Sequence, residues 1–561
     1  GPKPLGLSIS AIRKFVEDHP RVKTHHLTTS QVNSEFVKPE TKDLYSSYLE
    51  LYHGSIDDAT GSPLVADATV FVSHAWKYAF YDIVVNVMEQ YAQQHPGTYF
   101  WFDLFTNNQN EVANKDFEWF STTFRDSLIS IGEVLLVLSP WNNPIPIQRA
   151  WCLFEIYNAL EESGVVFSVK LPEKEIEELR ASLRDDPDCI SEALAVIEAE
   201  KAQAKSESDR QLIFQVIRES EGGFVHMNEQ VKDGLREWYV YQLKQAVNEE
   251  QDSYVLIEHC ASVLKQFGHL DDALHYYTKS LQMELTTLGE NTEAVAGTYN
   301  NMGNVCQEQG KLTKAIEYYN KSLETKKNVL GENSERVATS YNNIANVYCD
   351  LDETDKGLEY YNKSLKIRLD VLGDNHPDVA ACYNNLAIVY EDEGDVDKAL
   401  DYYNKSLAIQ FDTLGETHMD VSGTYNNMAL LYTNDDQLDK ALEYYQKSLN
   451  IVVKIFGEGN PEVATEYNNM GVVYKNKGEL DKALDMHHKA LEIRLPALGE
   501  NHPDVANSLH NIGLVYDGKG RRSDALNYLN RALKIRRKIY SEDHPQVEKS
   551  LQCIQRVMTA S

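Results

Sequence analysis

A 42-residue period runs through the second half of this sequence and restricts its fold more than any other feature. The anchor Tyr-Asn-Asn begins at Tyr299, Tyr341, Tyr383, Tyr425 and Tyr467, and a degenerate copy begins at Leu509. A second signature, Lys-Ser-Leu, recurs at the same spacing from Lys279 to Lys447. Units of this length cannot bury a core alone, so copies at a fixed spacing indicate a solenoid of stacked helical hairpins.

One copy has the pattern of two helices joined by a glycine turn. Tyr299, Met302, Gly303 and Cys306 fall at i, i+3, i+4 and i+7, which is one face of a first helix. Gly310 supplies the turn, and small residues such as Gly303 or Ala345 let the second helix approach closely. The second helix carries Ala315, Tyr318, Tyr319 and Leu323.

This pattern resembles the tetratricopeptide repeat (TPR). The segment from Leu498 to Ala506, Leu-Gly-Glu-Asn-His-Pro-Asp-Val-Ala, is most similar to the kinesin light chain version of that repeat. The resemblance extends from about Tyr254 to Val547, and a helix from Gln546 to Met558 is expected to cap the stack. We therefore expect a solenoid of about seven 42-residue repeats over residues 251–561, followed by a capping helix.

The residue after each anchor tyrosine is an asparagine beside the packing face, and these residues should form a ladder along a concave groove. An amide can both donate to and accept from a peptide backbone, and the TPR resemblance implies that the groove binds peptides. Acidic residues nearby, among them Glu308 and Asp392, favour a basic ligand. The alternatives are that the asparagines bridge neighbouring helices and that the solenoid drives self-association. The ladder consists of Asn300, Asn342, Asn384, Asn426 and Asn468.

Residues 67–250 alternate strands with helices, which predicts an α/β domain with a parallel, flavodoxin-like sheet. The expected strands are 69–73, 99–103, 134–138 and 165–169, with a short fifth strand at Phe224-Val225-His226. The expected helices are 81–93, 117–129, one that carries Trp151 and Glu155, an acidic segment at 173–203, and a connector at 231–247. Residues 1–66 are expected to form a helical extension.

Three motifs in this domain resemble the Toll/interleukin-1 receptor (TIR) domain. Phe71-Val72-Ser73-His74-Ala75 is similar to the first-strand motif, and Phe102-Asp103 to the second-strand aspartate. Ser139-Pro140 followed by Trp151-Cys152-Leu153-Phe154-Glu155 is similar to the third strand and the Trp-Cys-x-x-Glu segment of plant and bacterial members. The resemblance covers about Asp67 to Val169.

The TIR resemblance implies NAD⁺ as a substrate, cleaved at the nicotinamide–ribose bond, with no bound cofactor. Glu155 would then be catalytic and Trp151 would stack on nicotinamide. A carboxylate stabilises the positive charge that develops on the ribose, and nicotinamide leaves as a neutral molecule without a general acid. Residues at the adjoining strand ends would bind the rest of the substrate: Ser73, His74, Trp76, Asp103 and Phe105.

Two other functions compete with this hypothesis. Trp76-Lys77-Tyr78 lacks the acidic and basic pair that many TIR domains show after the first strand, which favours a non-enzymatic TIR–TPR scaffold that binds protein partners. Trp151 and Glu155 would then be an ordinary core residue and a solvated helix residue. A motor–cargo adaptor is disfavoured because residues 1–250 show no heptad coiled coil before the repeats.

The composition narrows the partners further. The 561 residues carry a net charge of −32, with acidic residues spread along the chain, which argues against binding to nucleic acid or to anionic membranes. The seven cysteines are scattered and include no Cys-x-x-Cys pair, so they predict buried thiols in a reducing compartment rather than disulfides or a metal site. No segment is apolar enough to span a membrane, and we expect a cytoplasmic protein.

Overall fold

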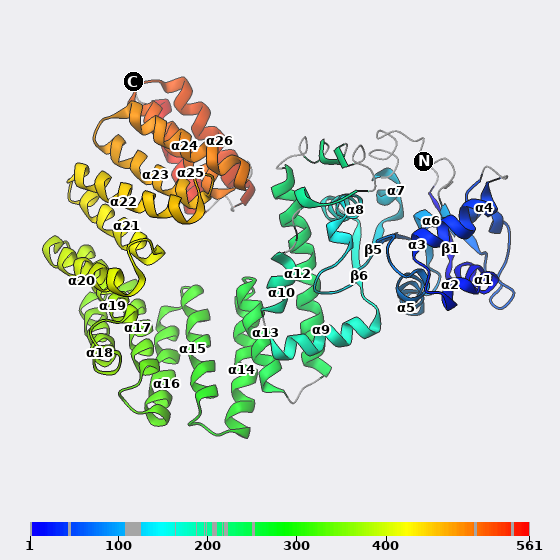
Figure 1. Cartoon of the computed structure of the whole chain (residues 1–561), viewed down its shortest axis with the longest axis horizontal. Helices are drawn as coiled ribbons and strands as arrows, with labels where there is room; N and C mark the ends of the chain where they lie inside the picture. Colours follow the sequence, from blue (N-terminus) through cyan, green and yellow to red (C-terminus); the bar gives the residue numbers. More distant parts are fainter. Residues whose placement is uncertain are drawn as a thin grey trace. The chain divides into compact units, whose positions relative to one another are not determined.

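The chain divides into two compact units, Gly1–Phe267 and Gly268–Ser561, each described here by itself (Figure 1). The computed structural model describes residues 3–42, 46–106, 125–249, 253–498, 502–539 and 544–559. Within the third range it leaves out residues 163, 187, 196, 198, 205–209, 212, 216 and 218–222. The predicted boundary lay between residues 250 and 251, whereas helix α13 (Tyr254–Gln266) falls inside the first unit.

The first unit is built around a six-stranded sheet in the order β2-β1-β4-β3-β5-β6. Strands β4, β3, β5 and β6 pair in parallel, while β1 pairs antiparallel with both β2 and β4. The four strands predicted at 69–73, 99–103, 134–138 and 165–169 thus pair in parallel as expected, and two strands that were not predicted make the sheet mixed at one edge. The strands are β1 (Leu5–Ser8), β2 (Val65–Asp67), β3 (Val70–Ser73), β4 (Tyr99–Trp101), β5 (Glu133–Val137) and β6 (Val166–Lys170).

The two extra strands come from the segment that was predicted to be a helical extension. Gly6 allows β1 to lie against the backbone of Phe100, because a Cβ on Gly6 would meet the Phe100 carbonyl at 3.0 Å. A strand of four residues with a central glycine has no alternating or β-branched pattern, so the sequence gives no strand signal there. Residues 1–66 are thus part of the α/β unit.

Helices surround this sheet. Residues Phe224-Val225-His226, predicted as a strand, lie inside the long helix α12, because their apolar run continues a helical pattern. Most of the predicted helix 117–129 lies outside the described residues. The helices are α1 (Ile9–Asp18), α2 (Arg21–Thr24), α3 (Thr29–Val32), η1 (Asn33–Val37), α4 (Lys38–Thr41), η2 (Tyr48–Tyr52), η3 (Phe80–Val85), α5 (Asn86–Gln94), α6 (Asp103–Thr106), α7 (Arg125–Ile131), η6 (Pro146–Gln148), α8 (Ala150–Glu161), α9 (Glu173–Asp185), α10 (Cys189–Ala195), η7 (Ala199–Lys201), α12 (Gly223–Glu249) and α13.

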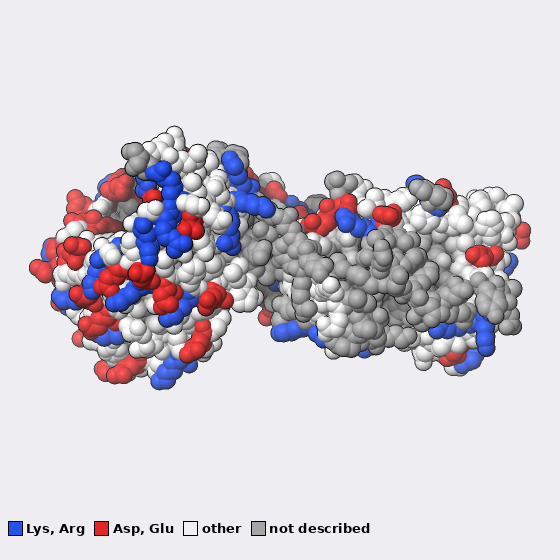
Figure 2. Space-filling model, turned by 90° about the horizontal axis from the view of Figure 1, so that it is seen from above, with Lys and Arg blue, Asp and Glu red and all other residues white. Residues whose placement is uncertain are grey.

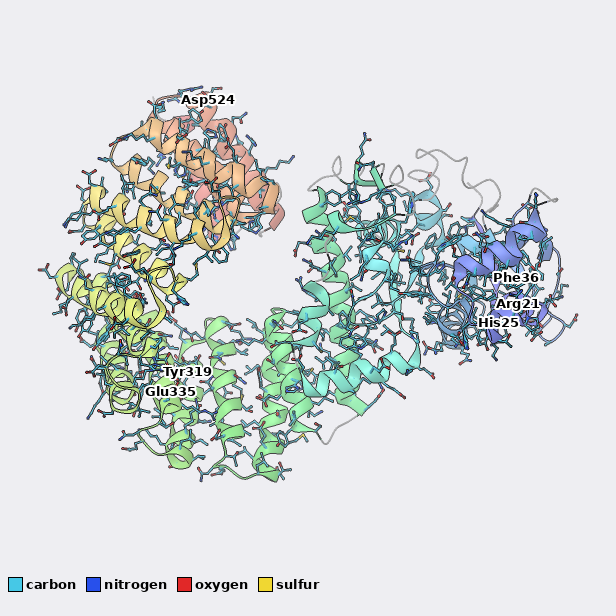
Figure 3. The ribbon with its side chains drawn as sticks, viewed as in Figure 1. Arg21, His25, Phe36, Tyr319, Glu335 and Asp524 are labelled. Atoms are coloured by element: carbon cyan, nitrogen blue, oxygen red, sulfur yellow. The ribbon has the colours of Figure 1, made fainter. Side chains whose placement is uncertain are left out.

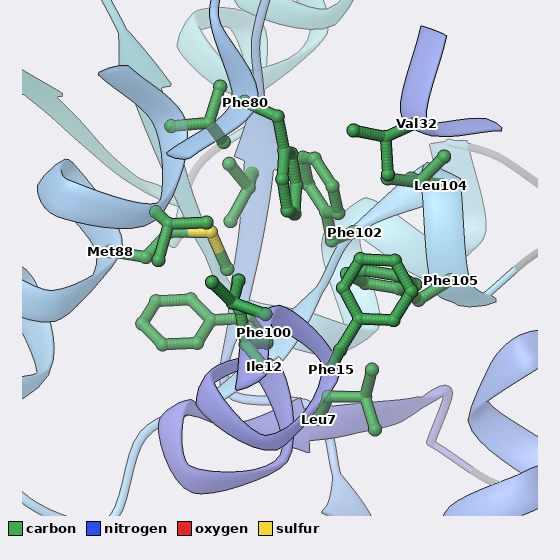
Figure 4. Close-up of a cluster of buried hydrophobic side chains, with 14 of the residues drawn as sticks. Leu7, Ile12, Phe15, Val32, Phe80, Met88, Phe100, Phe102, Leu104 and Phe105 are labelled. Carbon is green, nitrogen blue, oxygen red and sulfur yellow. The ribbon is translucent and has the colours of Figure 1, made fainter. Parts of the chain in front are cut away.

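An aromatic cluster forms the main core of the first unit (Figure 4). The ring of Phe15, on α1, lies 4.9 Å from that of Phe105 and 6.1 Å from that of Phe80. Phe102 packs against the same rings at the end of β4. This core fixes α1 and α6 on the sheet next to the carboxyl ends of β3 and β4.

The described part of the second unit contains six helical pairs, preceded by α14 and followed by α27. Each second helix packs against its own first helix and against the first helix of the next pair. Tyr319 on α16 and Glu335 at the start of α17, labelled in Figure 3, lie on two such neighbours. The helices are α14 (Leu270–Thr287), α15 (Glu293–Glu308), α16 (Leu312–Leu330), α17 (Glu335–Asp350), α18 (Thr354–Leu372), α19 (Pro377–Asp392), α20 (Val396–Leu414), α21 (Met419–Asn434), α22 (Leu438–Phe456), α23 (Pro461–Asn476), α24 (Leu480–Leu498), α25 (Pro503–Gly518), α26 (Arg522–Ile539) and α27 (Pro545–Thr559).

Close helix packing depends on the small residue predicted for each first helix. A Cβ on Gly303 would lie 2.6 Å from the ring of Tyr319, and a Cβ on Gly471 would lie 2.7 Å from the ring of His487. Gly310 has a φ of 71°, which a glycine adopts without strain, and it closes the turn between α15 and α16. The repeat therefore folds as its sequence predicts.

Charge and thiols are distributed as the sequence indicates. Acidic and basic side chains are interspersed over the face of the second unit seen in Figure 2. All seven cysteines are free thiols, and only Cys349 and Cys553 are partly exposed. In the described part of the chain, none of the helices has the length and apolar character required to cross a lipid bilayer.

Candidate functional site

A cluster of polar side chains lies at the carboxyl end of β3. Ser73 is the last residue of that strand, and its hydroxyl donates a short hydrogen bond to Oε2 of Glu155 on α8. Helix α8 brings Glu155 to this edge because one side of the helix is apolar and packs on the sheet through Cys152, Leu153 and Ile156. The sequence assigned both Ser73 and Glu155 to a common site, and the fold brings them together.

Burial determines the protonation of this cluster. It raises the pKa of Glu155 to about 8. The hydrogen bond from Ser73 lowers this pKa by a smaller amount, and the negative charge of Asp103 raises it slightly further. Burial also raises the pKa of Asp103 to about 6 and lowers the pKa of His74 to about 3. At neutral pH the cluster thus holds a largely protonated Glu155 and a neutral His74.

Further hydrogen bonds tie the neighbouring segments together. The indole Nε1 of Trp76 donates to Oδ2 of Asp103 at 2.8 Å, which links the segment after β3 to the segment after β4. The thiol of Cys152 donates to the carbonyl oxygen of His74 at 3.4 Å. The buried Nε2 of His74 has no hydrogen-bond partner among the described residues. A buried polar atom without a partner costs stability, so such atoms gather where function maintains them.

One of the predicted substrate-binding residues lies elsewhere. Phe105 is buried in the aromatic cluster beside Phe15 and Tyr48, so it does not line a substrate loop as predicted. The cause is that α6 turns the chain inward directly after β4. Trp151 is partly exposed, and its ring packs edge-on against Phe154 at 6.2 Å.

Sequence reasoning missed a second link across the same edge of the sheet. The hydroxyl of Tyr78 donates to the carbonyl oxygen of Ser139 at 2.5 Å, and the hydroxyl of Ser139 donates to Glu175 on α9. The motif Ser139-Pro140 marked this position, but Tyr78 and Glu175 belong to no motif. They hold the end of β5 beside the Glu155 cluster.

In the second unit, the asparagine ladder exists and bridges consecutive repeats. The second asparagine of one anchor donates its Nδ2 to Oδ1 of the first asparagine in the preceding repeat. The first asparagines therefore use their oxygen for packing, as the bridging alternative proposed, while the Nδ2 groups of Asn300, Asn342, Asn384 and Asn468 donate to no group in the described residues. The bridges are Asn343 to Asn300 at 3.1 Å, Asn385 to Asn342 at 2.9 Å, Asn427 to Asn384 at 3.4 Å and Asn511 to Asn468 at 2.9 Å.

The ladder is interrupted at Asn426. Its Nδ2 donates to Oε1 of Glu466 at 2.6 Å, and its Oδ1 is buried without a partner in the described part of the solenoid. Glu466 is only 2% exposed, and burial raises its pKa. The equivalent residue is Ser508 one repeat later, so a carboxyl group replaces a hydroxyl at this point.

The acidic residues that favoured a basic ligand occupy the last turns of the first helices. Glu308, Asp350 and Asp392 are exposed. Asp350 accepts a hydrogen bond from Gln307, and Glu391 accepts from Asn434 and from Tyr403. The carboxylates of Glu308, Asp350 and Asp392 thus remain accessible to solvent.

Two cavities lie in the solenoid. One of about 220 Å³ is lined by Asn300, Asn301, Lys326 and four further residues of α15 to α17. A larger one of about 660 Å³ lies at the turns around Gly394 and Asp435. No group of side chains in the described ranges has the composition and spacing to hold a metal ion.

Comparisons with known proteins identify the second unit. The family model of the tetratricopeptide repeat matches residues 256–328, 294–345, 336–410, 420–475 and 462–538. No curated protein matches the chain. The helical pairs of the second unit are therefore tetratricopeptide repeats, and the prediction made from their period is confirmed.

Several solved structures are similar to part of the chain. BtubC (BKLC) from P. vanneervenii is 26% identical over 42% of this chain and 94% of that chain, with a TM-score of 0.37. A putative kinesin light chain from Podosopora anserina is 22% identical over 37% of this chain and 99% of that chain, with a TM-score of 0.34. A tetratricopeptide repeat protein from Parabacteroides merdae is 16% identical over 55% of this chain and all of that chain, with a TM-score of 0.38.

Proposed function

We propose that this chain is a scaffold protein whose tetratricopeptide solenoid binds a peptide segment of a partner protein. The observation that carries the proposal is the set of amide donors left over by the asparagine ladder. Each bridge uses the oxygen of a first asparagine, while the Nδ2 groups of Asn300, Asn342, Asn384 and Asn468 have no acceptor among the residues that the structure describes. Donors one or two repeats apart suit the backbone carbonyls of an extended ligand, whatever its side chains.

Isosteric substitution separates this role from the packing role of the ladder. In Asn342→Asp with Asn384→Asp, an oxygen still accepts from Asn385 and Asn427, but each Nδ2 donor becomes a second acceptor. Full-length wild-type protein, panned against a displayed library of random peptides, is expected to enrich binders that the double variant does not retain. Equal retention by both proteins would contradict the proposal.

The matched control carries the same change of charge away from the ladder. Asn362 and Asn404 are exposed on the second helices α18 and α20. The variant Asn362→Asp with Asn404→Asp should keep the selected peptides at wild-type affinity. Loss of binding in this control would assign the effect to net charge instead of to the donors.

The Glu155 cluster supports a second candidate function, cleavage of NAD⁺ by a TIR-like first unit. The supporting observation is a carboxyl group held by Ser73 at the carboxyl end of a central parallel strand, where open α/β sheets bind ligands. In this mechanism ionised Glu155 stabilises the positive charge that develops on ribose as nicotinamide leaves, and water then attacks the same carbon. Because the pKa of Glu155 is about 8, the rate should rise with pH up to that value.

Release of nicotinamide from NAD⁺ tests this candidate directly. Wild-type protein should release nicotinamide, and Glu155→Gln should abolish the release. Ser73→Ala should shift the pH profile to higher pH, because the lost hydrogen bond no longer favours the ionised carboxylate. Glu17→Gln, an exposed position on α1, is the control and should leave the rate unchanged. No release by wild type over a range of protein concentrations would exclude the activity.

A further inference from the structure

The face of the first helices that carries the ladder asparagines changes character midway along the solenoid. Four residues after each ladder asparagine, the first two complete repeats carry Asn304 and Asn346, and later repeats carry apolar residues. We call Ile388, Leu430 and Val472 the apolar stripe. Ile388 is 38% exposed and Leu430 is 48% exposed, and Val472 is partly exposed. Leu514, one repeat further, packs against the buried cluster of Leu529 and Val557 and is not part of the stripe.

A change in the hydrogen bonding of the second helices makes room for this stripe. Asn304 and Asn346 accept hydrogen bonds from the hydroxyls of Tyr319, at 2.6 Å, and Tyr361. In the next repeat the hydroxyl of Tyr403 donates to Oε2 of Glu391 at 3.1 Å instead. The tyrosine hydroxyl of this repeat therefore needs no acceptor at position 388, and an isoleucine there costs no internal hydrogen bond.

The apolar stripe runs beside the unused donors. Residues four apart on a helix are neighbours on its surface, so Ile388 adjoins Asn384 and Val472 adjoins Asn468. Between them, the donor of Asn426 is already bonded to Glu466. A ligand on this face thus meets an apolar side chain at every repeat and a free amide donor at every second repeat.

The spacing of the repeats selects a backbone conformation. Hydrogen bonds join consecutive first helices, from Asn427 to Asn384 and from Asn426 to Glu466, and helices in contact lie about 8–10 Å apart. A polyproline II segment rises about 3.1 Å per residue with three residues per turn, so every third side chain points the same way about 9 Å further along. Its carbonyl groups make no internal hydrogen bonds and are free to accept from asparagine. Residues i, i+3 and i+6 of such a segment match successive positions of the stripe.

Charge sets the ligand's orientation. Exposed acidic side chains, Glu308, Asp350 and Asp392, end the first helices α15, α17 and α19, whereas the equivalent positions in α21 and α23 are Asn434 and Asn476. Lys475 adds a positive charge to the last turn of α23. A ligand complementary to this face carries basic residues at the end that lies over α15 to α19.

We propose that the apolar stripe binds a polyproline II segment of a partner protein that has an apolar side chain at every third residue and basic residues at one end. This inference rests on the proposed protein-binding role of the solenoid and specifies the ligand of its groove. Each side chain of the stripe loses its contact with water in the complex, and the free Nδ2 groups of Asn384 and Asn468 donate to ligand carbonyls.

Synthetic peptides test the inference with the full chain. The probe has leucine at every third residue in a proline-rich background and a terminal Lys-Lys, and it is labelled for fluorescence anisotropy. A second peptide has the same composition with its leucines at every second residue. We expect the first to bind at least tenfold more tightly than the second. Equal affinities would overturn the proposed register.

Matched variants locate the binding surface. Leu430→Asn introduces the asparagine that is found two repeats earlier at the equivalent position, Asn346. The affinity for the probe peptide should fall about ten- to hundredfold, as expected for the loss of one buried leucine contact. Val371→Asn changes an equally exposed apolar residue at the end of α18, away from the stripe, and should have no effect. Because both side chains are exposed in the wild type, both variants should fold, which circular dichroism checks.

The outcomes separate this inference from the proposed function. Suppose library peptides still depend on Asn342 and Asn384 but show no three-residue register and no sensitivity to Leu430→Asn. The scaffold role then stands and the polyproline II ligand is wrong. Self-association of the full chain that Leu430→Asn abolishes, measured by sedimentation, would instead assign the stripe to a second copy and would also overturn the inference.

Discussion

Glu155 illustrates how a single side chain links the fold of the first unit to its stability. The carboxyl group is placed at the sheet edge by the apolar side of α8, and one hydroxyl, that of Ser73, donates to it. Among the described residues no cation shifts its pKa, so burial dominates and favours the neutral acid. The folded state therefore binds a proton that the unfolded chain releases.

The pH dependence of stability should reveal this proton. The pKa of Glu155 is about 8 in the folded chain and 4.5 as an ordinary glutamate, so unfolding releases a proton between these pH values, and the free energy of unfolding falls as pH rises through that window. Below pH 4.5 both states are protonated, and the effect vanishes. The free energy of unfolding of Glu155→Gln should exceed that of wild type by about 2–4 kcal/mol at pH 8.5 and should differ little from it at pH 4.5.

Urea unfolding of the two proteins at both pH values measures this difference. Glu17→Gln at an exposed position of α1 serves as the reference and should follow wild type at each pH. A gain that is independent of pH would mean that the carboxyl group is ionised in the folded state, contrary to the argument. Contributions from His74 and Asp103 occur in both proteins and largely cancel.

Residues of the sheet-edge cluster were partly predictable. Ser73 ends a clear β-branched strand, and Glu155 lies one helical turn after Trp151, so strand and helix patterns suffice to place both at one edge. Phe105 and Tyr78 were not predictable in this way. Whether an aromatic residue after a strand enters the core depends on the turn that follows, and α6 has no sequence signal strong enough to show it.

At the scale of elements, the helical pair depends on close contact between its two helices. Gly303 faces the ring of Tyr319 with no room for a side chain, while Gly297, on the same helix α15, has nothing within 4 Å of where a Cβ would lie. Ala345 occupies the place of Gly303 in the next repeat, where it faces Tyr361. Helix α15 thus has one glycine in contact with the second helix and one glycine with space for a side chain.

Alanine substitution should separate these two glycines. Gly303→Ala forces the Tyr319 ring away and should destabilise the second unit by about 1–3 kcal/mol, because overpacking outweighs the gain in helix propensity. Gly297→Ala should instead stabilise it by about 0.5–1 kcal/mol, since only propensity changes. Thermal unfolding of both variants is the measurement, and the same sign for both would refute the packing argument.

The elements differ in how well sequence alone defines them. The repeat helices follow from their period, because identical spacing in several copies averages out local ambiguity, and the predicted cap at 546–558 matches α27. Strand β1 gave no signal, since it is short, holds a glycine and pairs with residues far along the chain. The false strand at Phe224 arose because a short apolar run does not distinguish a strand from a segment of helix.

At the scale of the whole molecule, two units with different architectures share one chain. The first is an α/β unit whose contacts join distant segments, such as β1 with β4. The second is a solenoid in which each helix packs against its neighbours in sequence. Each has its own buried clusters, and their boundary lies between Phe267 and Gly268.

Independent cores predict independent unfolding, and the variants above report on it. Scanning calorimetry of the full chain should show two transitions, because substitutions in different compact units act separately. At pH 8.5, Glu155→Gln should raise the midpoint of one transition and leave the other in place, whereas Gly303→Ala should lower only the other. The double variant should show the sum of both shifts. A single transition that both substitutions move would mean that the two units unfold as one cooperative body, and the stability of the Glu155 cluster would then depend on the solenoid.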